Sequence, residues 1–152
     1  MPGLVLALAW PTCTVVLLEA SERRCAFLDE ALGDLSLAAT VSIAYGRAED
    51  LARTLDLEGR FDLVTARSFG PPGVVAECAA RLLAPGGVLV VAEPPEAERS
   101  AERWPTEGLA ELGLGPAAPT GSIRHLVVIE RTGTCPDRYP RRVGVPSKRP
   151  LF

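Results

Sequence analysis

Glu19 is the residue whose type and position most suggest ligand chemistry. It directly follows the aliphatic run from Thr14 to Leu18, which is typical of a buried strand. In a doubly wound fold that binds a nucleoside, an acidic residue at this place accepts two hydrogen bonds from the ribose hydroxyls. The same carboxylate would also be favoured by the macrodipole of a helix that begins after it. Ribose binding is therefore one interpretation of Glu19, and helix stabilisation is the other.

Arg67 ends another strand-like run, from Phe61 to Ala66, and carries a different chemistry. An arginine is always charged and presents a planar fork of donors. At the end of a strand beside a ligand it could orient RNA or the electronegative edge of a base. A solvated surface arginine is the alternative.

These side chains require a sheet whose strands end along one edge. Short apolar or β-branched runs predict strands over residues 14–18, 40–45, 61–66, 88–92 and 126–129. Single helices are predicted between most of them. Strands that alternate with helices form a mostly parallel sheet with helices on both faces, and ligands bind at the carboxyl ends of the strands. The fold class is therefore α/β.

Helical periodicity predicts which side chains face the core. After the potential N-cap Ser21, the predicted stripe consists of Phe27, Leu28, Ala31, Leu32 and Leu35. A helix over residues 47–57 would bury Ala48, Leu51, Ala52 and Leu55. The helix after Pro71 would bury Val74, Val75, Cys78, Ala79, Leu82 and Leu83, and would stop at the turn Pro85-Gly86-Gly87. A polar, weakly helical stretch follows from Glu96 to Leu112.

Composition indicates an ordinary globular chain. The 152 residues are 47% hydrophobic and 23% charged, which fits one domain. No run of about 20 apolar residues is present, so no transmembrane helix is expected. The apolar N-terminus up to Leu18 is interrupted by Pro11 and Thr12 and has no basic leader, unlike a signal peptide.

Charge is unevenly distributed along the chain. The formal net charge is −3, yet the segment from Asp137 to the end holds five cations against one anion. A basic tail of this kind could contact RNA phosphates. The simpler interpretation is a solvated, poorly ordered terminus.

The cysteine and histidine content argues against a metal centre. Cys13, Cys25, Cys78 and Cys135 form no CxxC pair, and there is a single histidine, His125. The pattern fits free thiols in a reducing cytoplasm, and we expect a cytoplasmic protein without a metal. His125 is assigned no role.

Several motifs taken together resemble one family. They are the N-terminal Pro2-Gly3 with its aliphatic continuation, Leu17-Leu18-Glu19 with Arg23-Arg24 and Phe27-Leu28, Phe61-Asp62 with Ala66-Arg67, Arg124 to Ile129, and the tail that begins Tyr139-Pro140-Arg141-Arg142. Leu82 to Leu89 also resembles the turn before the fifth strand of class I S-adenosylmethionine methyltransferases. The whole set is similar to the GidB/RsmG family, which methylates a guanine of small-subunit ribosomal RNA.

The resemblance implies a fold, a cofactor and site residues. The fold would be a Rossmann-like class I methyltransferase sheet, and the cofactor S-adenosyl-L-methionine. Glu19 would hold the ribose, Ala48 and Glu49 the adenine, and Gly3 the approach to the methionine moiety. Arg67 would bind the cofactor and, with Arg124, would face the RNA. Arg23, Arg24 and the cations of the tail would be supporting phosphate contacts. Guanine N7 of 16S-type RNA would accept the methyl group, with the RNA or the small subunit as partner, and the protein would be a monomer.

The chain departs from the family pattern at two places. Glu93-Pro94 stands where the family has a Lys-Gly, which leaves open a class I methyltransferase with another substrate. The chain also begins at the Pro-Gly match, so the family's first strand and most of its Gly-rich loop are not expected in the sheet. A start assigned too late and a shortened, non-catalytic RNA-binding or ribosome-binding remnant both explain this. We expect a core over residues 1–132 and a basic Pro/Arg-rich tail over 133–152.

Overall fold

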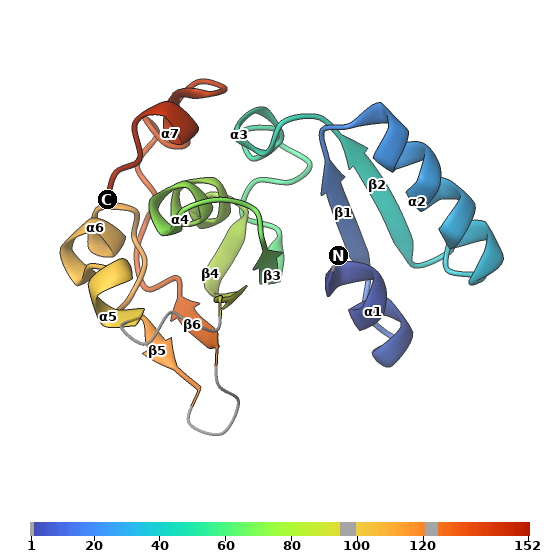
Figure 1. The fold of residues 1–152 in the computed structure, drawn as a ribbon, viewed down its shortest axis with the longest axis horizontal. Coiled ribbons are helices and arrows are strands. Elements are labelled where there is room, and N and C mark those ends of the chain that lie inside the picture. The colour runs from blue at the N-terminus through green and yellow to red at the C-terminus, as the bar shows by residue number, and fades with distance from the viewer. Residues whose placement is uncertain (1, 95–99, 121–124) are drawn as a thin grey trace. The chain divides into compact units, whose positions relative to one another are not determined.

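The computed structural model describes residues 2–94, 100–120 and 125–152 (Figure 1). The chain divides into two compact units, Met1–Leu51 and Ala52–Phe152. Each unit is described by itself below.

The first unit is a small parallel sheet covered by helices. It contains α1 (Pro2–Ala9), β1 (Val15–Glu19), α2 (Glu22–Asp34), β2 (Val41–Tyr45) and α3 (Ala48–Leu51). Strands β1 and β2 run parallel, with Glu19 opposite Tyr45 at their shared carboxyl end. Because a helix connects two parallel strands, the unit confirms the α/β prediction. Within the described residues β1 pairs with β2 alone.

The core of the first unit confirms only part of the predicted stripe on α2. Leu28 and Leu32 are buried and pack with Leu17 of β1. Phe27 and Leu35 were expected to face the core as well, but they are 57% and 41% exposed. This part of the prediction is wrong, because a two-stranded sheet contacts only a narrow face of the helix.

Helix α3 is much shorter than predicted. It ends at Leu51, whereas the apolar spacing had indicated a helix to residue 57. Ala52 is fully buried as expected, but Leu55 is 90% exposed rather than inward. Helical spacing alone does not form a helix here, since short helices depend on tertiary packing for their stability.

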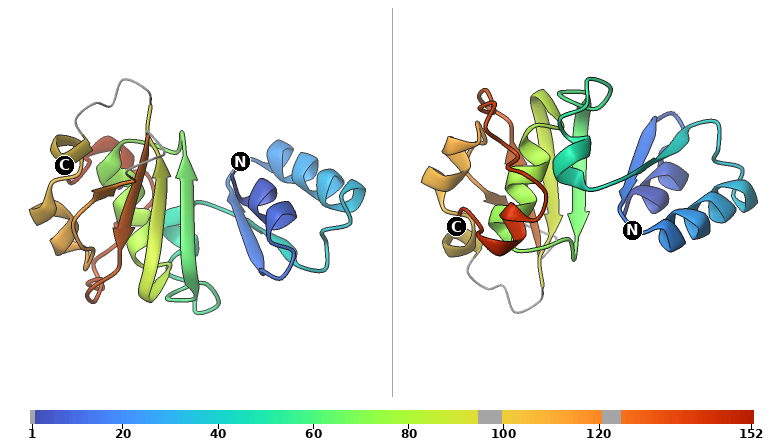
Figure 2. Two further views of the ribbon diagram at one scale, coloured as in Figure 1. Left: turned by 90° about the horizontal axis from the view of Figure 1, so that it is seen from below. Right: turned by 90° about the horizontal axis from the view of Figure 1, so that it is seen from above.

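The second unit contains a four-stranded mixed sheet. Its elements are β3 (Phe61–Arg67), α4 (Pro72–Ala80), β4 (Leu83–Ala92), α5 (Ser100–Arg103), α6 (Thr106–Glu111), β5 (Ala118–Pro119), β6 (Leu126–Glu130) and α7 (Val145–Lys148). The strand order is β3-β4-β6-β5. Strands β3 and β4 are parallel, and β6 joins β4 antiparallel, as the two views in Figure 2 show.

The Pro85-Gly86-Gly87 turn lies inside β4 rather than at a helix end. Helix α4 stops at Ala80, and β4 already begins at Leu83, so the prediction that Leu82 and Leu83 belong to the helix is wrong. Both residues are nevertheless buried. A Cβ on Gly87 would lie 2.7 Å from the carbonyl oxygen of Phe61, so the close approach of β3 here requires glycine.

The core of the second unit lies between this sheet and the helices on it. Leu83 and Leu89 of β4, Ile129 of β6 and Leu109 of α6 are fully buried. Trp104 is 1% exposed and joins the same cluster. Cys78 is buried on α4, which confirms the prediction of a core thiol.

The C-terminal segment is folded onto the second unit. Tyr139, Pro140 and Pro146 are buried, and α7 packs against α4. The expectation of a solvated, poorly ordered terminus is therefore wrong. Alternating hydrophobic patterns do not reveal such a segment, because its contacts are made by prolines and by side-chain hydrogen bonds rather than by an apolar stripe.

Candidate functional site

Glu19 lies at the carboxyl end of β1, where the following turn holds its carboxylate. The backbone N–H of Ser21 donates to Glu19 Oε1 at 2.8 Å. Arg24 at the start of α2 donates Nη2–H to the same oxygen at 2.8 Å, and its Nε lies 2.8 Å from Oε2. The Arg24 side-chain hydrogen bond lowers the pKa of Glu19 below its ordinary value, so the carboxylate is ionised at neutral pH.

The number of contacts limits what Glu19 can still bind. A carboxylate oxygen has two lone pairs, and those of Oε1 are used by Ser21 and Arg24. Oε2 keeps one lone pair beside the Arg24 contact. Glu19 can therefore accept one further hydrogen bond in this arrangement, and it can accept two only if Arg24 moves away. The side chain of Arg24 is 66% exposed, so little packing opposes that movement.

The loop after β2 lies at the same end of the sheet as Glu19. Gly46 donates its backbone N–H to the carbonyl of Glu19 at 2.9 Å, which joins the two strand ends. Its φ of +152° and its contact with Leu51 allow the chain to turn directly into α3. Ala48 and Glu49 begin that helix, and Glu49 is buried. The structure thus brings the candidates Glu19, Ala48 and Glu49 to one edge of the first unit.

The close packing around Gly3 explains why this position has no side chain. A Cβ at this position would lie 2.7 Å from Leu17 Cδ2, so either the Leu17 side chain or α1 would have to shift. The missing side chain at Gly3 therefore serves the packing of α1 on the strand.

Arg67 ends β3 at the carboxyl edge of the sheet in the second unit. Its side chain is exposed, and within the described residues it has no ion-pair partner. Ser68 follows with a positive φ of 52°, which marks a sharp exit from the strand. This exposure fits both interpretations of Arg67, an RNA-facing residue and a solvated surface arginine. Arg124, the other candidate, lies outside the described residues.

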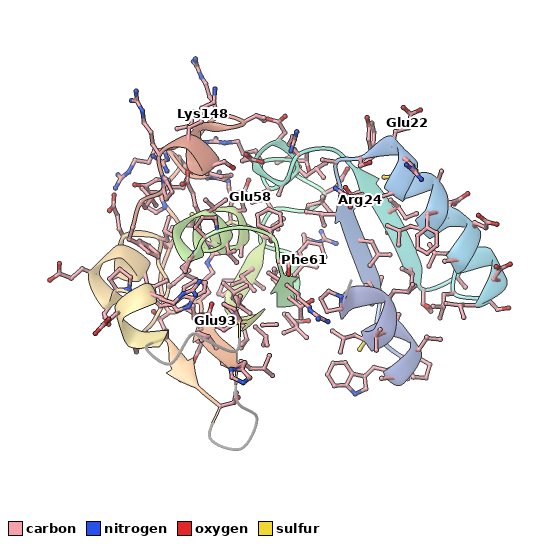
Figure 3. All side chains as sticks on the ribbon, in the orientation of Figure 1. Glu22, Arg24, Glu58, Phe61, Glu93 and Lys148 are labelled. Atoms are coloured by element: carbon pink, nitrogen blue, oxygen red, sulfur yellow. The ribbon has the colours of Figure 1, made fainter. Side chains whose placement is uncertain are left out.

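Glu93 lies beside this edge but does not present a negative charge to solvent. It follows Ala92, the partner of Arg67 in the parallel register. Its side chain is 4% exposed, and Oε2 lies 3.1 Å from Arg103 Nε. Its backbone N–H donates to the carbonyl of His125 at 2.7 Å. Figure 3 labels Glu93 where the strands of this unit end. The anion that replaces the family's lysine is therefore buried and neutralised.

Sequence reasoning missed the contact that matters most at Glu19. The resemblance implied a supporting phosphate contact for Arg24, yet its guanidinium contacts both oxygens of the candidate ribose ligand. The five-residue separation across a strand-to-helix turn is the signal that could have indicated the contact.

Neither a metal cluster nor a membrane helix is found. The part of the chain that the structure describes contains no group of three or more histidine, cysteine or acidic side chains able to hold a metal ion. In the same residues no helix is both long and apolar enough to cross a membrane.

Comparison with known structures defines the class of protein. The Pyrococcus furiosus methyltransferase superposes with a TM-score of 0.56 at 18% identity, over 84% of this chain and 68% of that one. The structure of PigF with SAH superposes with a TM-score of 0.62 at 15% identity, over 84% of this chain and 46% of that one. The fold is that of the class I methyltransferases.

The particular family follows from sequence comparison. The family model for GidB, described as rRNA small subunit methyltransferase G, matches residues 1–107. The Ribosomal RNA small subunit methyltransferase G of Pelotomaculum thermopropionicum is 36% identical over 99% of this chain, and that of a Thermotoga species is 36% identical over 100%. The chain belongs to the GidB family. It spans 65% of the length of the Pelotomaculum relative and 68% of the Thermotoga one.

Proposed function

We propose that this chain transfers a methyl group from S-adenosyl-L-methionine to small-subunit ribosomal RNA, with guanine N7 as the acceptor. The observation that carries the proposal is the ionised carboxylate of Glu19, held at the shared carboxyl end of β1 and β2 in a member of this family. Ligands bind at that end of the strands in open α/β sheets. The proposal implies a cytoplasmic protein, where ribosomal RNA is found, and a monomer stays our expectation.

The residues of the first unit fit the nucleoside part of the cofactor. Glu19 would accept hydrogen bonds from the ribose hydroxyls, through the free lone pair of Oε2 and through positions that Arg24 releases. Ala48 and Glu49 would lie along the adenine, because Gly46 joins their loop to Glu19. Gly3 would lie toward the methionine moiety and would keep α1 against β1.

The residues of the second unit fit an anionic substrate. Arg67 is exposed and unpaired within the described residues, so its guanidinium could bind a phosphate or a guanine edge in a bidentate manner. Arg124 stays in the proposal as a second RNA-facing residue. The anion Glu93, which had suggested another substrate, is paired with Arg103 and does not oppose RNA binding.

The chemistry requires positioning more than acid–base catalysis. The cofactor supplies an electrophilic methyl group on a sulfonium centre. Guanine N7 already carries a lone pair, so no side chain must remove a proton from it. Alignment of N7 with the methyl group accounts for most of the expected rate, since orientation alone can lower a barrier by several kcal/mol.

The test is methyl transfer from radiolabelled S-adenosyl-L-methionine to small subunits from a strain that lacks the modification. We expect label in the small-subunit RNA, with cleavage at an N7-methylated guanine after borohydride and aniline treatment. Arg67→Gln should reduce the rate of methyl transfer. Label on another base would indicate a different acceptor, and no label would favour the non-catalytic RNA-binding remnant.

A further inference from the structure

We propose that residues 141–149 form a preformed surface that binds RNA phosphates. We call this segment the basic loop, and its exposed cations are Arg142, Lys148 and Arg149. The inference rests on the proposed function in that it takes RNA as the partner. It adds a second contact surface, at a segment that the methyl-transfer site does not include.

A buried carboxylate fixes the start of the basic loop. Glu77 on α4 is fully buried and accepts hydrogen bonds from the backbone N–H of Arg141 at 2.7 Å and from its Nη2 at 2.6 Å. Arg141 Nε also donates to Oε1 at 2.9 Å. This hydrogen bonding raises the pKa of Arg141, so its guanidinium stays charged. The pair ties the loop to the core helix of the second unit.

Two further arginines donate hydrogen bonds to the residues that precede the basic loop. Arg81 donates to the carbonyl of Tyr139 at 3.0 Å and pairs with Asp137 at 3.3 Å. Arg53 donates to the carbonyls of Asp137 and Pro140, each at 2.9 Å. These donors satisfy backbone acceptors that no strand or helix satisfies. The chain therefore enters the basic loop in one defined direction.

The loop closes on itself and brings its cations together. Arg141 Nη2 donates to the carbonyl of Arg149 at 2.8 Å, although the residues are eight apart in sequence. The backbone N–H of Val145 donates to the carbonyl of Arg142, and that of Arg149 to the carbonyl of Val145, each at 2.9 Å. These hydrogen bonds link Arg142 to the start of α7 and Arg149 to its end, and Lys148 is the last residue of α7 (Figure 3).

The three cations differ from their neighbours in having no internal partner. Arg138 pairs with Glu111, while Arg141 pairs with Glu77. Within the described residues Arg142, Lys148 and Arg149 have no ion pair. Cations on one short loop gain most from a polyanion that neutralises several of them at once. Because the loop is already ordered, little conformational entropy is lost when it binds.

RNA fits this surface better than an anionic membrane does. Membrane-surface segments combine cations with an apolar face that enters the lipid. In the basic loop Pro146 is buried and Val143 is the exposed large apolar residue, so no such face exists. Arginine and lysine side chains are the usual contacts to RNA phosphates.

The experiment compares two charge-matched double variants of the full chain. Arg142→Gln/Lys148→Gln removes two cations of the basic loop. Arg60→Gln/Arg138→Gln removes two exposed cations elsewhere, one of them paired with Glu111. Affinity for a fluorescein-labelled hairpin of small-subunit ribosomal RNA is measured by anisotropy from 50 to 200 mM salt. Thermal unfolding of both variants is recorded alongside.

We expect the loop variant to bind about tenfold more weakly, with a salt slope reduced by about 1.5, since each lost phosphate contact lowers the slope by about 0.7–0.9. The control should bind within about twofold of the wild type. Equal affinity of the loop variant and the wild type, or no RNA binding by the wild type, would overturn the inference. Loop-dependent binding to phosphatidylglycerol vesicles in place of RNA would also overturn it.

Calorimetry with S-adenosyl-L-methionine separates this inference from the proposed function. If neither protein binds the cofactor but the loop variant still loses RNA affinity, the proposed methyl transfer fails and the RNA surface stands. If the cofactor binds, methyl transfer proceeds and the loop variant keeps its RNA affinity, the surface is wrong and the function stands.

Discussion

At the scale of single residues, the contact between Glu19 and Arg24 determines how many hydrogen bonds Glu19 could accept from the ribose that we propose. The guanidinium of Arg24 occupies both carboxylate oxygens, and the Ser21 N–H takes the second lone pair of Oε1. A ribose that needs two acceptors must compete with Arg24. The ion pair is largely exposed on the Arg24 side and therefore weak, because water and salt screen such pairs.

Arg24→Met should tighten the binding of S-adenosyl-L-methionine by about two- to fivefold, the range that an exposed ion pair allows. The variant releases lone pairs of Glu19 without removing the carboxylate. Isothermal titration calorimetry measures the change. Arg23→Met, at the neighbouring exposed cation, is the matched control and should leave the affinity unchanged. Weaker binding in the Arg24 variant would show that Arg24 orients Glu19 instead of competing with the ribose.

The same variant has a pH signature. Arg24 lowers the pKa of Glu19, so this carboxylate stabilises the fold above its unfolded pKa, and the contribution is lost as pH falls through the lower folded pKa. In Arg24→Met the Glu19 pKa should rise toward its ordinary value. NMR titration of the side-chain carboxyl carbon measures it, and an unchanged value would contradict the contact.

At the scale of elements, α4 is the helix on which the C-terminal segment is anchored. The carboxylate of Glu77 forms an ion pair with Arg141 and accepts a hydrogen bond from its backbone N–H. Gly73, in the first turn, lies against the last two residues of the chain. A helix predicted only as a core element therefore also fixes the position of a segment 60 to 80 residues later in the sequence.

Glu77→Gln should lower the free energy of unfolding by about 3–5 kcal/mol, because it leaves the charge of Arg141 without its buried partner. Urea unfolding measures the change. Glu30→Gln, at an exposed position of α2, is the control and should have little effect. Equal effects of the two substitutions would mean that Glu77 does not anchor the tail.

Gly73→Ala should destabilise the protein by about 1–3 kcal/mol, the usual effect of overpacking. Its Cβ would lie 2.8 Å from the carbonyl oxygen and 3.1 Å from the nitrogen of Phe152. Gly33→Ala in α2 is the control, since a Cβ there meets nothing within 4 Å, and it should stabilise the protein by about 0.5–1 kcal/mol. Stabilisation by both substitutions, followed by thermal unfolding, would contradict the packing of the C-terminus on α4.

Strands were easier to predict than helices or the tail. The runs before Glu19, Gly46 and Arg67 became β1, β2 and β3, because short runs of apolar or β-branched residues favour strands. The short α3 and the exposed Leu55 were not predictable, since tertiary contacts decide where a short helix ends. The site followed the same rule. Strand ends located Glu19 and Arg67, whereas the Arg24 contact depends on the geometry of a turn.

At the scale of the whole molecule, the two units carry different parts of the proposed activity. The first presents Glu19, Ala48 and Glu49 at one sheet edge, and these residues suit a nucleoside. The second presents Arg67 and the basic loop, which suit RNA. The strongly basic C-terminal segment of an otherwise acidic chain thus has a fixed place in the second unit, and RNA is the partner that we propose for it.

The central claim is that Glu19 holds the ribose of S-adenosyl-L-methionine, and calorimetric titration of that cofactor tests it most directly. The wild-type chain should bind the cofactor, and Glu19→Ala should bind it at least about tenfold more weakly, because the variant loses two charge-assisted hydrogen bonds. Thermal unfolding confirms that the variant remains folded. Equal affinity of the folded variant and the wild type, or no binding by either, would contradict the account.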